Sequence, residues 1–401
     1  MPQRQKGWGE RREVYLDSNA TTRVAPEVLE EMLPYFCDLY GNPSSPHRFG
    51  SKVAERIREA RERVADLLGA HPDEIVFTSC GTESDNAAIM GTLASYPEKR
   101  RIVTTQVEHP AVLNLCRYLE QKGYGVTYLA VDSKGMIDLD ELRESITNDT
   151  ALVSIMYANN ETGVIFPIEE IGEIVKERGV VFHCDAVQAV GKIPIDLRFG
   201  KIDLLSLSGH KLHAPKGIGA LYIRGGTKFI PYLIGGHQEG GRRAGTENVP
   251  SIIGLGKACM LAKESMAEEQ QKIKALRDRL EEGILERIPG VLVNGDRANR
   301  LPNTSNMSFE AVEGEAILLM LSEEGIAASS GSACSSGEQE PSHVLGAMSV
   351  PSSAIHGTIR FSLSRYNTED EINYILEKLP PIIQRLRELS PFWPKDQRAA
   401  S

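Results

Sequence analysis

Lys211 lies between two short apolar runs in the stretch LLSLSGHKLHAPKGIGALYI, residues 204–223. Each run has the length of a buried strand, and lysine is rarely buried without a partner. A lone lysine at such a place is more often part of a solvated turn. A chemical role for Lys211 therefore depends on whether other reactive side chains are expected at the same place.

The elements that would position Lys211 form a regular alternation of strands and helices. Helices are expected from about residues 83, 110 and 139 and over 168–178, between strands at 74–79, 101–106, 125–131, 151–158, 180–186, 203–208 and 219–223. Helices over 26–36 and 51–69 precede them, the second with a Ser start and a Gly stop. The alternation predicts an α/β fold with a mainly parallel, seven-stranded sheet wrapped by helices.

A second pattern follows a long charged helix, which is expected with breaks over 247–286. Short strands are expected at 291–295, 303–310, 326–334 and 358–364, with helices at 313–324 and 368–388. This mixture is typical of a smaller α+β domain. We therefore expect a large domain over residues 15–260 and a small domain formed by 1–14 and 261–401.

Polar side chains follow several of the expected parallel strands, and the carboxyl ends of such strands meet at a ligand-binding edge. A Gly turn into a helix, of the kind whose amides attract phosphate, begins at Cys80. The other strand ends carry His109, Asn159 with Asn160, Asp185 with Gln188, and Gly209 with His210 and Lys211. Each residue alone has an ordinary explanation as a turn or helix-start residue, but chance is a poor account of the whole set.

Pyridoxal phosphate is the cofactor whose chemistry needs this set. A lysine amine forms a Schiff base with its aldehyde, and a carboxylate such as Asp185 keeps the ring nitrogen protonated, which makes the ring an electron sink. Nucleotide-binding motifs fit less well, because GIGALY has Tyr222 where the third glycine belongs and no P-loop is present. We therefore predict that Lys211 is a cofactor lysine.

Composition and charge narrow the class of protein. The chain has 401 residues and a net charge of −10, which argues against nucleic-acid or anionic-membrane surfaces. No apolar run approaches the roughly 18 residues of a membrane span, and the polar N-terminus does not look like a signal peptide. We expect a cytoplasmic protein without a metal site, because the six cysteines form no Cys-x-x-Cys pair and His210-x-x-His213 is a weak signal. Buried structural thiols are expected at Cys37, Cys116, Cys184 and Cys259.

The sequence resembles the cysteine desulfurases of the NifS/IscS type, class-V aminotransferases with the fold of fold-type I pyridoxal-phosphate-dependent transferases. The resemblance runs from about Tyr15 to about Leu389 and is closer to the NifS branch. It is carried by YLDSNATT, YGNPSSPH, FTSCGTESDN, EHPAVLN, NNETGV, DAVQAVGK, SGHKLHAPKG, RRAGTENVP, SSGSACSSG and IRFSLSRYNT.

The resemblance implies a role for each candidate residue. The cofactor lysine would be Lys211, and His109 would stack on the ring and shuttle protons. The cofactor phosphate would contact Gly81, Thr82, Ser208 and His210, and Thr246 would reach the phosphate of the other subunit. The phenolic oxygen would contact Asn160 and Gln188, and the ring nitrogen Asp185. The substrate carboxylate would contact Arg360 and Asn160.

Cys334 lies in the Gly- and Ser-rich run ASSGSACSSGEQEP, which suits an exposed, mobile thiol, and the resemblance places the catalytic cysteine here. It implies a homodimer that converts L-cysteine to L-alanine through a Cys334 persulfide and passes the sulfur to an iron–sulfur scaffold protein. The alternative is that the chain is a selenocysteine lyase or another aminotransferase-like enzyme that depends on pyridoxal phosphate. A catalytically idle scaffold is disfavoured, because it would not need Lys211, Asp185, His109 and Cys334 together.

Overall fold

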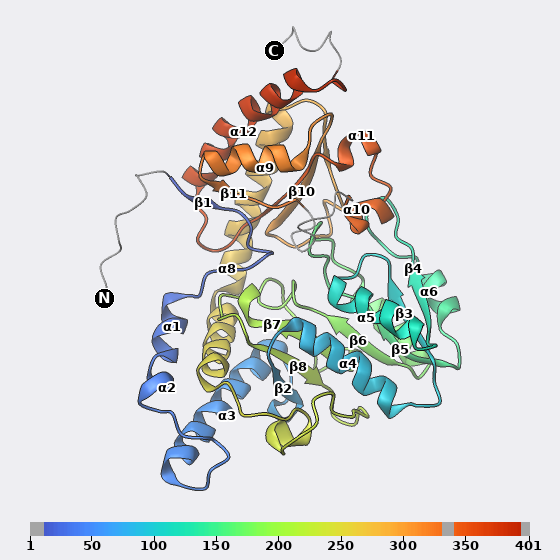
Figure 1. Cartoon of the computed structure of the whole chain (residues 1–401), viewed down its shortest axis with the longest axis vertical. Coiled ribbons are helices and arrows are strands. Elements are labelled where there is room, and N and C mark those ends of the chain that lie inside the picture. The colour runs from blue at the N-terminus through green and yellow to red at the C-terminus, as the bar shows by residue number, and fades with distance from the viewer. Residues whose placement is uncertain (1–11, 331–340, 394–401) are drawn as a thin grey trace.

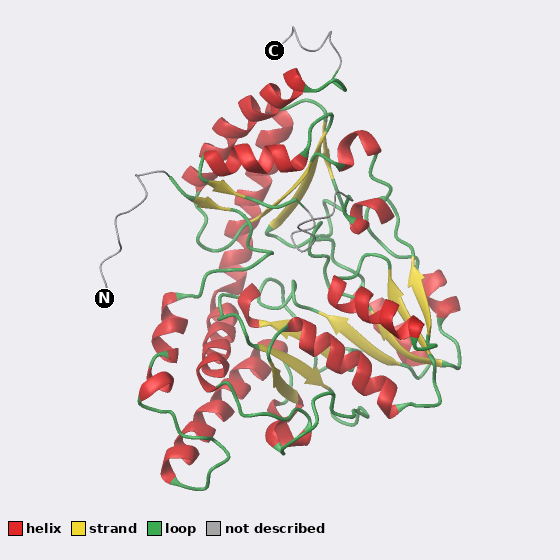
Figure 2. Ribbon diagram, viewed as in Figure 1, coloured by secondary structure: helices red, strands yellow, loops and turns green. Residues whose placement is uncertain are grey.

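The computed structural model describes residues 12–330 and 341–393. A broad sheet with helices on both faces forms one part of the molecule, and a smaller sheet with its own helices forms the other (Figure 1). Figure 2 shows the small sheet and the broad sheet at opposite ends of one long helix. Cys334, the expected catalytic cysteine, lies outside the described residues.

The broad sheet, as far as the chain is described, has seven strands in the order β2-β8-β7-β6-β5-β3-β4. Only β8 runs antiparallel to its neighbours, so the mainly parallel sheet predicted from the sequence is confirmed. The strands are β2 (Ile75–Thr78), β3 (Arg101–Thr105), β4 (Gly125–Leu129), β5 (Thr150–Ser154), β6 (Val181–Asp185), β7 (Leu204–Ser208) and β8 (Gly219–Ile223). Every residue of β6 and β7 is buried, as expected for strands covered on both faces.

Helices pack on both faces of this sheet. On one face, Ile89 of α4 (Gly81–Ser95) and Val112 of α5 (Pro110–Gln121) pack in one core with Ile102 and Leu152 of the sheet. The core on the other face of the sheet includes residues of α1 (Pro26–Met32), α3 (Arg48–Leu68), α6 (Leu139–Ser145), α7 (Ile168–Glu177) and the first part of α8 (Val249–Arg287). The short α2 (Pro34–Cys37) follows α1. As the Gly stop predicted, α3 ends at Gly69, whose φ of 62° is left-handed.

The smaller part contains two short sheets. A two-stranded parallel pair is formed by β1 (Val14–Tyr15) and β11 (Ile326–Ala327). The strand expected over 326–334 thus ends at Ala327 within the described residues, and 331–334 lie outside them. The antiparallel sheet has the order β12-β10-β9, with β9 (Val291–Val293), β10 (Thr304–Phe309) and β12 (Thr358–Ser362). Its core contains residues of α9 (Gly314–Glu323) and α12 (Glu369–Leu389). By contrast, α10 (His343–Ala347) and α11 (Ser352–Ile355) place Val344, Leu345 and Ile355 in the same core as the broad sheet.

The long helix α8 joins the two parts (Figure 1). The sequence predicts breaks in this helix, and the prediction is wrong, because Val249–Arg287 is one continuous helix of 39 residues. Its first turns bury Ile252 and Leu255 in the core of the broad sheet, and Leu280 and Ile284 lie in the core of the smaller part. Despite this length, no helix within 12–330 or 341–393 is apolar enough to cross a membrane.

One cysteine differs from expectation. Cys116, Cys184 and Cys259 are buried as predicted, whereas Cys37 is exposed. It is the last residue of α2, a single turn whose buried position is taken by Tyr35. Burial in so short a helix depends on which side faces the core, and residue type alone does not determine that side.

Candidate active site

Lys211 lies directly after the carboxyl end of β7, in the 3₁₀ turn η2 (Gly209–Lys211). Its Nζ donates hydrogen bonds to the main-chain oxygen of Asn19 and, at 2.8 Å, to that of Ala20. Gly209 permits the turn, because a Cβ there would lie 2.8 Å from Cγ2 of Ile218. The apolar run before Lys211 is therefore a buried strand that brings this lysine to the sheet edge.

Asp185 ends the neighbouring strand β6 and is buried. Burial raises the pKa of its carboxyl to about 6, while a hydrogen bond from the Val187 amide at 2.9 Å and the charge of Lys211 oppose that rise. The Val187 amide and the charge of Lys211 thus favour the ionised form of this carboxyl against the effect of burial. Because the charge of Lys211 acts on it, the two groups lie within electrostatic reach of one another.

His109 lies at the start of α5, after β3. Its Nδ1 accepts a hydrogen bond from the Ala111 amide at 3.1 Å, which leaves the proton of the neutral ring on Nε2. Burial lowers the pKa of His109 to about 4, with a further contribution from the charge of Lys211. The structure thus brings a neutral imidazole, a carboxylate and a lysine to one edge of the sheet.

The predicted phosphate turn lies at the start of α4. Gly81 is closely packed, because a Cβ on it would lie 2.8 Å from Cγ2 of Val187 and 3.5 Å from Cβ of Ser208. Thr82 is exposed at the same helix start. His210 lies in the Lys211 turn, where its Nδ1 is 3.1 Å from Oγ1 of Thr21, and burial lowers the pKa of His210 to about 4.

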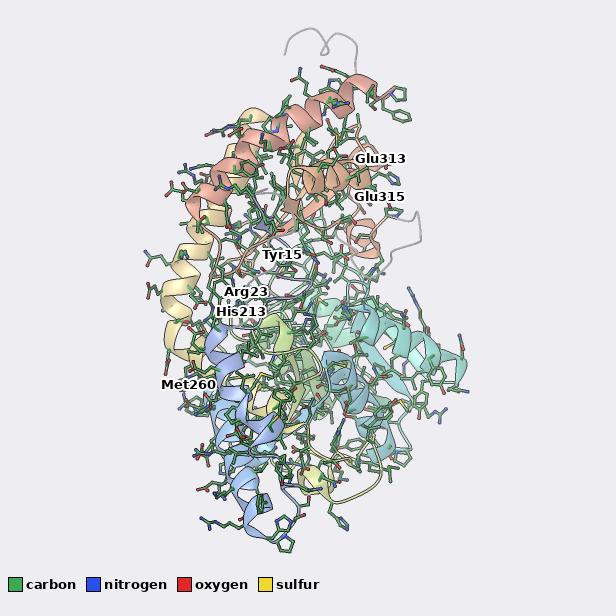
Figure 3. All side chains as sticks on the ribbon, turned by 60° about the vertical axis from the view of Figure 1, so that its left-hand side comes forward. Tyr15, Arg23, His213, Met260, Glu313 and Glu315 are labelled. Atoms are coloured by element: carbon green, nitrogen blue, oxygen red, sulfur yellow. The ribbon has the colours of Figure 1, made fainter. Side chains whose placement is uncertain are left out.

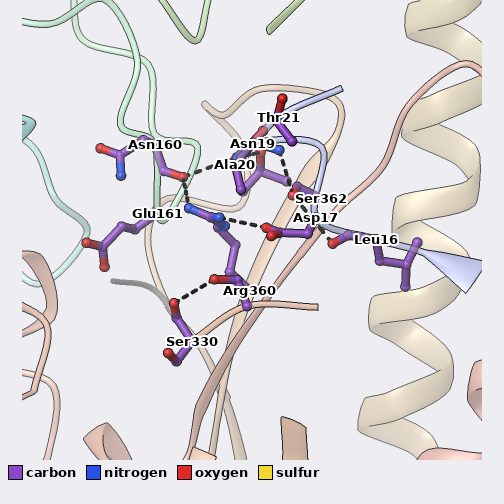
Figure 4. Close-up of polar contacts among 12 residues, drawn as sticks. Leu16, Asp17, Asn19, Ala20, Thr21, Asn160, Glu161, Ser330, Arg360 and Ser362 are labelled. Carbon is purple, nitrogen blue, oxygen red and sulfur yellow. Dashed lines mark hydrogen bonds and ion pairs between the residues drawn. The ribbon is translucent and has the colours of Figure 1, made fainter. Parts of the chain in front are cut away.

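Asn160 and Arg360 meet across the two parts of the molecule (Figure 4). Arg360 lies in β12, is 2% exposed and donates from Nη1 to the main-chain oxygen of Asn160 at 3.0 Å. Its Nη2 donates to Oδ1 of Asp17 at 2.8 Å. Among the described residues its buried Nε has no hydrogen-bond partner, so the guanidinium keeps donors for a further acceptor.

Gln188 lies at the same edge, and its Nε2 donates to the main-chain oxygen of Asn19 at 3.0 Å. Thr246 does not join this group in the described part of one chain. It is an exposed residue of the loop that precedes α8.

Three residues of the site carry no role in the sequence analysis: Asp17, Asn19 and Lys192. Asp17 pairs with Arg360, and Lys192 donates from Nζ to Oε1 of Gln188 at 2.7 Å. Asn19 contacts both Gln188 and Lys211. The sequence feature that could have indicated these three residues is their position inside YLDSNATT and DAVQAVGK, two of the motifs that carry the family resemblance.

These residues fit pyridoxal phosphate by the chemistry of their donors and by packing. A buried carboxylate stands ready for the ring nitrogen at Asp185. The Oγ of Ser208 is buried and has no hydrogen-bond partner among the described residues, so it can bond a phosphate oxygen. Gly81, which has no room for a side chain, opens the helix whose free amide groups favour an anion. The cofactor would therefore be held by Lys211, Asp185, Ser208 and the start of α4.

Known proteins resemble the chain over nearly its whole length. The Aminotransferase class-V family matches residues 14–375. A cysteine desulfurase of Nostoc sp. strain PCC 7120 is 62% identical over 94% of this chain and 95% of its own length. The cysteine desulfurase NifS of Azotobacter vinelandii is 58% identical over 95% of each chain.

Among solved structures, a NifS-like protein superimposes with a TM-score of 0.88 at 42% identity, covering 94% of this chain and 100% of its own. The family match over residues 14–375 covers both parts of the molecule and every described site residue. The chain thus belongs to the class-V aminotransferase family and, within it, to the pyridoxal-phosphate-dependent cysteine desulfurases.

Proposed function

We propose that the chain converts L-cysteine to L-alanine and takes up the sulfur on Cys334 as a persulfide. The carbon–sulfur bond of the substrate breaks, a sulfur–sulfur bond to Cys334 forms, and the hydrogen of the Cys334 thiol balances the alanine product. The observation that carries the proposal is the convergence of Lys211, Asp185 and His109 at the carboxyl ends of β7, β6 and β3. Cys334 itself lies outside the described residues, and its role rests on the family resemblance.

The roles of the polar residues follow from their protonation and burial. Bound pyridoxal phosphate supplies an electron sink beside the substrate. Asp185, ionised and buried, keeps the ring nitrogen protonated, and this preserves the electron sink. His109, whose pKa is about 4, is neutral at pH 7 and can take a proton. Lys211 holds the cofactor and, when released, moves a proton at its Nζ.

Assaying both products tests the reaction directly. Purified protein given L-cysteine and a thiol reductant is expected to release sulfide and alanine in equal amounts without a keto acid. An aminotransferase would instead need a keto-acid acceptor and would form alanine only with one. Faster turnover of selenocysteine, with cysteine left unused, would identify a selenocysteine lyase, which the cysteine desulfurase relatives make the less favoured reaction.

Arg360 is proposed to bind the substrate carboxylate together with Asn160. A guanidinium can grip a carboxylate through two parallel hydrogen bonds, and an ammonium group cannot reproduce this geometry. We therefore expect Arg360→Lys to raise the KM for L-cysteine about tenfold or more while the cofactor stays bound. Steady-state kinetics and cofactor absorbance measure the two effects.

Arg365→Lys is the matched control. Arg365 is a partly buried arginine that follows the end of β12, and its Nε lies 3.2 Å from Oε1 of Glu269. It is expected to leave the KM close to that of the wild type. An unchanged KM in Arg360→Lys together with a raised KM in Arg365→Lys would transfer the carboxylate-binding role to Arg365.

The chain is proposed to act as a homodimer. Several large apolar side chains are exposed on α1, α2 and the loop 230–234, among them Leu33, Phe36 and Ile234. Ile234 is 87% exposed, which a monomer would leave in water. The main-chain amide of Ala244 bonds Leu233 at 3.2 Å, so the loop that carries Thr246 is attached to this apolar surface. A subunit seated there would bring Thr246 close to the partner's site.

Mixed dimers test whether Thr246 acts on the partner's cofactor. A dimer of one Lys211→Ala chain and one Thr246→Ala chain contains one intact site if Thr246 acts across the interface, and none if it acts within its own chain. We expect about half of the wild-type activity per dimer. Dimers of wild-type and Lys211→Ala chains give the reference value, and activity no higher than in the Thr246→Ala homodimer would refute sharing.

The domain division, the acceptor and the compartment are further parts of the proposal. We propose a large domain over residues 15–260 and a small domain formed by 1–14 and 261–401. The boundary would lie inside α8, and the site would lie between the two domains. The five described cysteines are free thiols, which supports a reducing, cytoplasmic compartment. The resemblance to the NifS branch supports delivery of the sulfur to an iron–sulfur scaffold protein.

A further inference from the structure

Residues 17–22, here called the strap, cross the molecule between β12 and the Lys211 turn. At one end the Ser18 amide donates to the main-chain oxygen of Ser362 at 3.0 Å. At the other end the Thr22 amide donates to the main-chain oxygen of His210 at 2.9 Å. Just beyond the strap, Arg23 and His213 lie side by side (Figure 3), with Nδ1 of His213 3.0 Å from the Arg23 oxygen. The strap is therefore fixed on both sides of Lys211.

Asn19 is the most highly connected residue of the strap and is 1% exposed. Its Nδ2 donates to Oγ1 of Thr304 at 2.9 Å and to the main-chain oxygen of Asn160 at 3.2 Å. Its Oδ1 accepts from Nδ2 of Asn303 at 2.9 Å and from Nζ of Lys192 at 3.2 Å. These four hydrogen bonds use the full capacity of an asparagine side chain. They also fix its orientation, because the main-chain oxygen of Asn160 can only accept a hydrogen bond.

The main chain of the strap faces the predicted cofactor residues. The oxygen of Asn19 accepts from both Lys211 and Gln188, and the oxygen of Ala20 accepts from Lys211. Figure 4 labels Asp17, Asn19, Ala20 and Thr21 of the strap. Hydrogen bonds from an ammonium group to carbonyl oxygens stabilise its charged form. Both acceptors are neutral, so they hold the ammonium less strongly than a carboxylate would and allow it to lose its proton.

We propose that the main-chain oxygens of Asn19 and Ala20 form a seat for the Lys211 ammonium whenever that side chain is not joined to the cofactor, and that the Asn19 side chain is the positioning group that keeps this seat in place. The inference rests on the proposed function, in which Lys211 carries the cofactor and is released when the substrate binds. A released lysine must stay within reach of the site, and the two main-chain oxygens hold it there.

Chemical labelling of full-length protein freed of cofactor tests the seat apart from activity. Brief acetylation followed by peptide mapping is expected to modify Lys211 at least about tenfold more slowly than the exposed Lys216, because a seated ammonium is not nucleophilic. In Asn19→Ala the difference should shrink to less than about threefold, because the seat loses its side-chain anchors. Asn19→Ser provides the same test if the alanine variant does not fold.

Kinetics of the loaded enzyme separate positioning from general stability. We expect Asn19→Ala to lower kcat per bound cofactor about tenfold and to change the KM for L-cysteine less than about threefold. Asn367→Ala is the matched control, since Asn367 is a buried asparagine that anchors the main-chain oxygen of Tyr15 at 3.0 Å, on the same segment but away from Lys211. It should lower the melting temperature and leave kcat and Lys211 labelling unchanged.

Two results would contradict the proposal that the main-chain oxygens of Asn19 and Ala20 form a seat for Lys211. One is Lys211 labelling as fast as that of Lys216 in the wild type. The other is a folded Asn19 variant with unaltered Lys211 labelling and unaltered kcat per bound cofactor, even if its melting temperature falls. Neither result touches the proposed function, which fails instead if the cofactor is found on a residue other than Lys211.

Discussion

Replacing Lys211 with alanine is expected to lower sulfide release from L-cysteine by at least about a thousandfold, because the amine that holds the cofactor and moves the proton is lost. The chain should still fold, because Lys211 lies in a turn at the sheet edge and its strand, β7, keeps every buried residue. Sulfide and alanine assays measure the loss. In the wild type, borohydride reduction and peptide mapping should place the pyridoxyl mass on the peptide that contains Lys211.

Two other lysines, Lys216 and Lys192, are the alternative attachment sites against which this prediction is tested. Lys216 is exposed and five residues further along the chain, so Lys216→Ala should remain active. Lys192 is the stronger rival, because burial and then the charges of Lys211 and Arg360 lower its pKa well below the ordinary value, which favours the nucleophilic amine form. Its Nζ is engaged by Gln188 and Asn19, however. A pyridoxyl label on Lys192 or Lys216 would refute the assignment of Lys211.

The sheet was predictable from sequence because strands and helices alternate with clear apolar periods. The antiparallel direction of β8 was missed, although the connection from Ser208 to Gly219 is shorter than the crossover of about a dozen residues that a parallel neighbour needs. The continuity of α8 was missed for a different reason. No residue of α8 between Ala262 and Ile273 is buried, because this stretch passes from one core to the other, and the gap imitates a break in the helical pattern.

The site residues that the sequence indicated are those whose side chains perform recognisable chemistry at strand ends. Asp185, His109 and Lys211 follow that rule, and the structure brings them together. The strap does not follow it, because Asn19 and Ala20 act through main-chain oxygens, which residue type does not reveal. Asp17 was missed because it lies 343 positions from its partner Arg360, so only the fold brings the two together.

Replacing Cys334 with serine is expected to lower the release of sulfide and alanine by more than about a hundredfold, because a hydroxyl is too weakly acidic to replace a thiolate as the nucleophile. The cofactor should stay bound, and its absorbance should still change on addition of L-cysteine, because those steps use Lys211, His109 and the ring. Wild-type protein given L-cysteine without reductant should carry one additional sulfur atom on the peptide containing Cys334.

The remaining cysteines serve as controls that the structure divides into two groups. Burial raises the pKa of Cys116 and Cys259 to about 12 and that of Cys184 well above its ordinary value, so none of the three supplies a thiolate at neutral pH. Cys37 is exposed and Cys80, which directly precedes the phosphate turn, is partly exposed. Cys80→Ser and Cys37→Ser are therefore the decisive comparisons, and both should remain active. Full sulfide release by Cys334→Ser, with its loss in Cys80→Ser, would move the sulfur-accepting role to the start of α4.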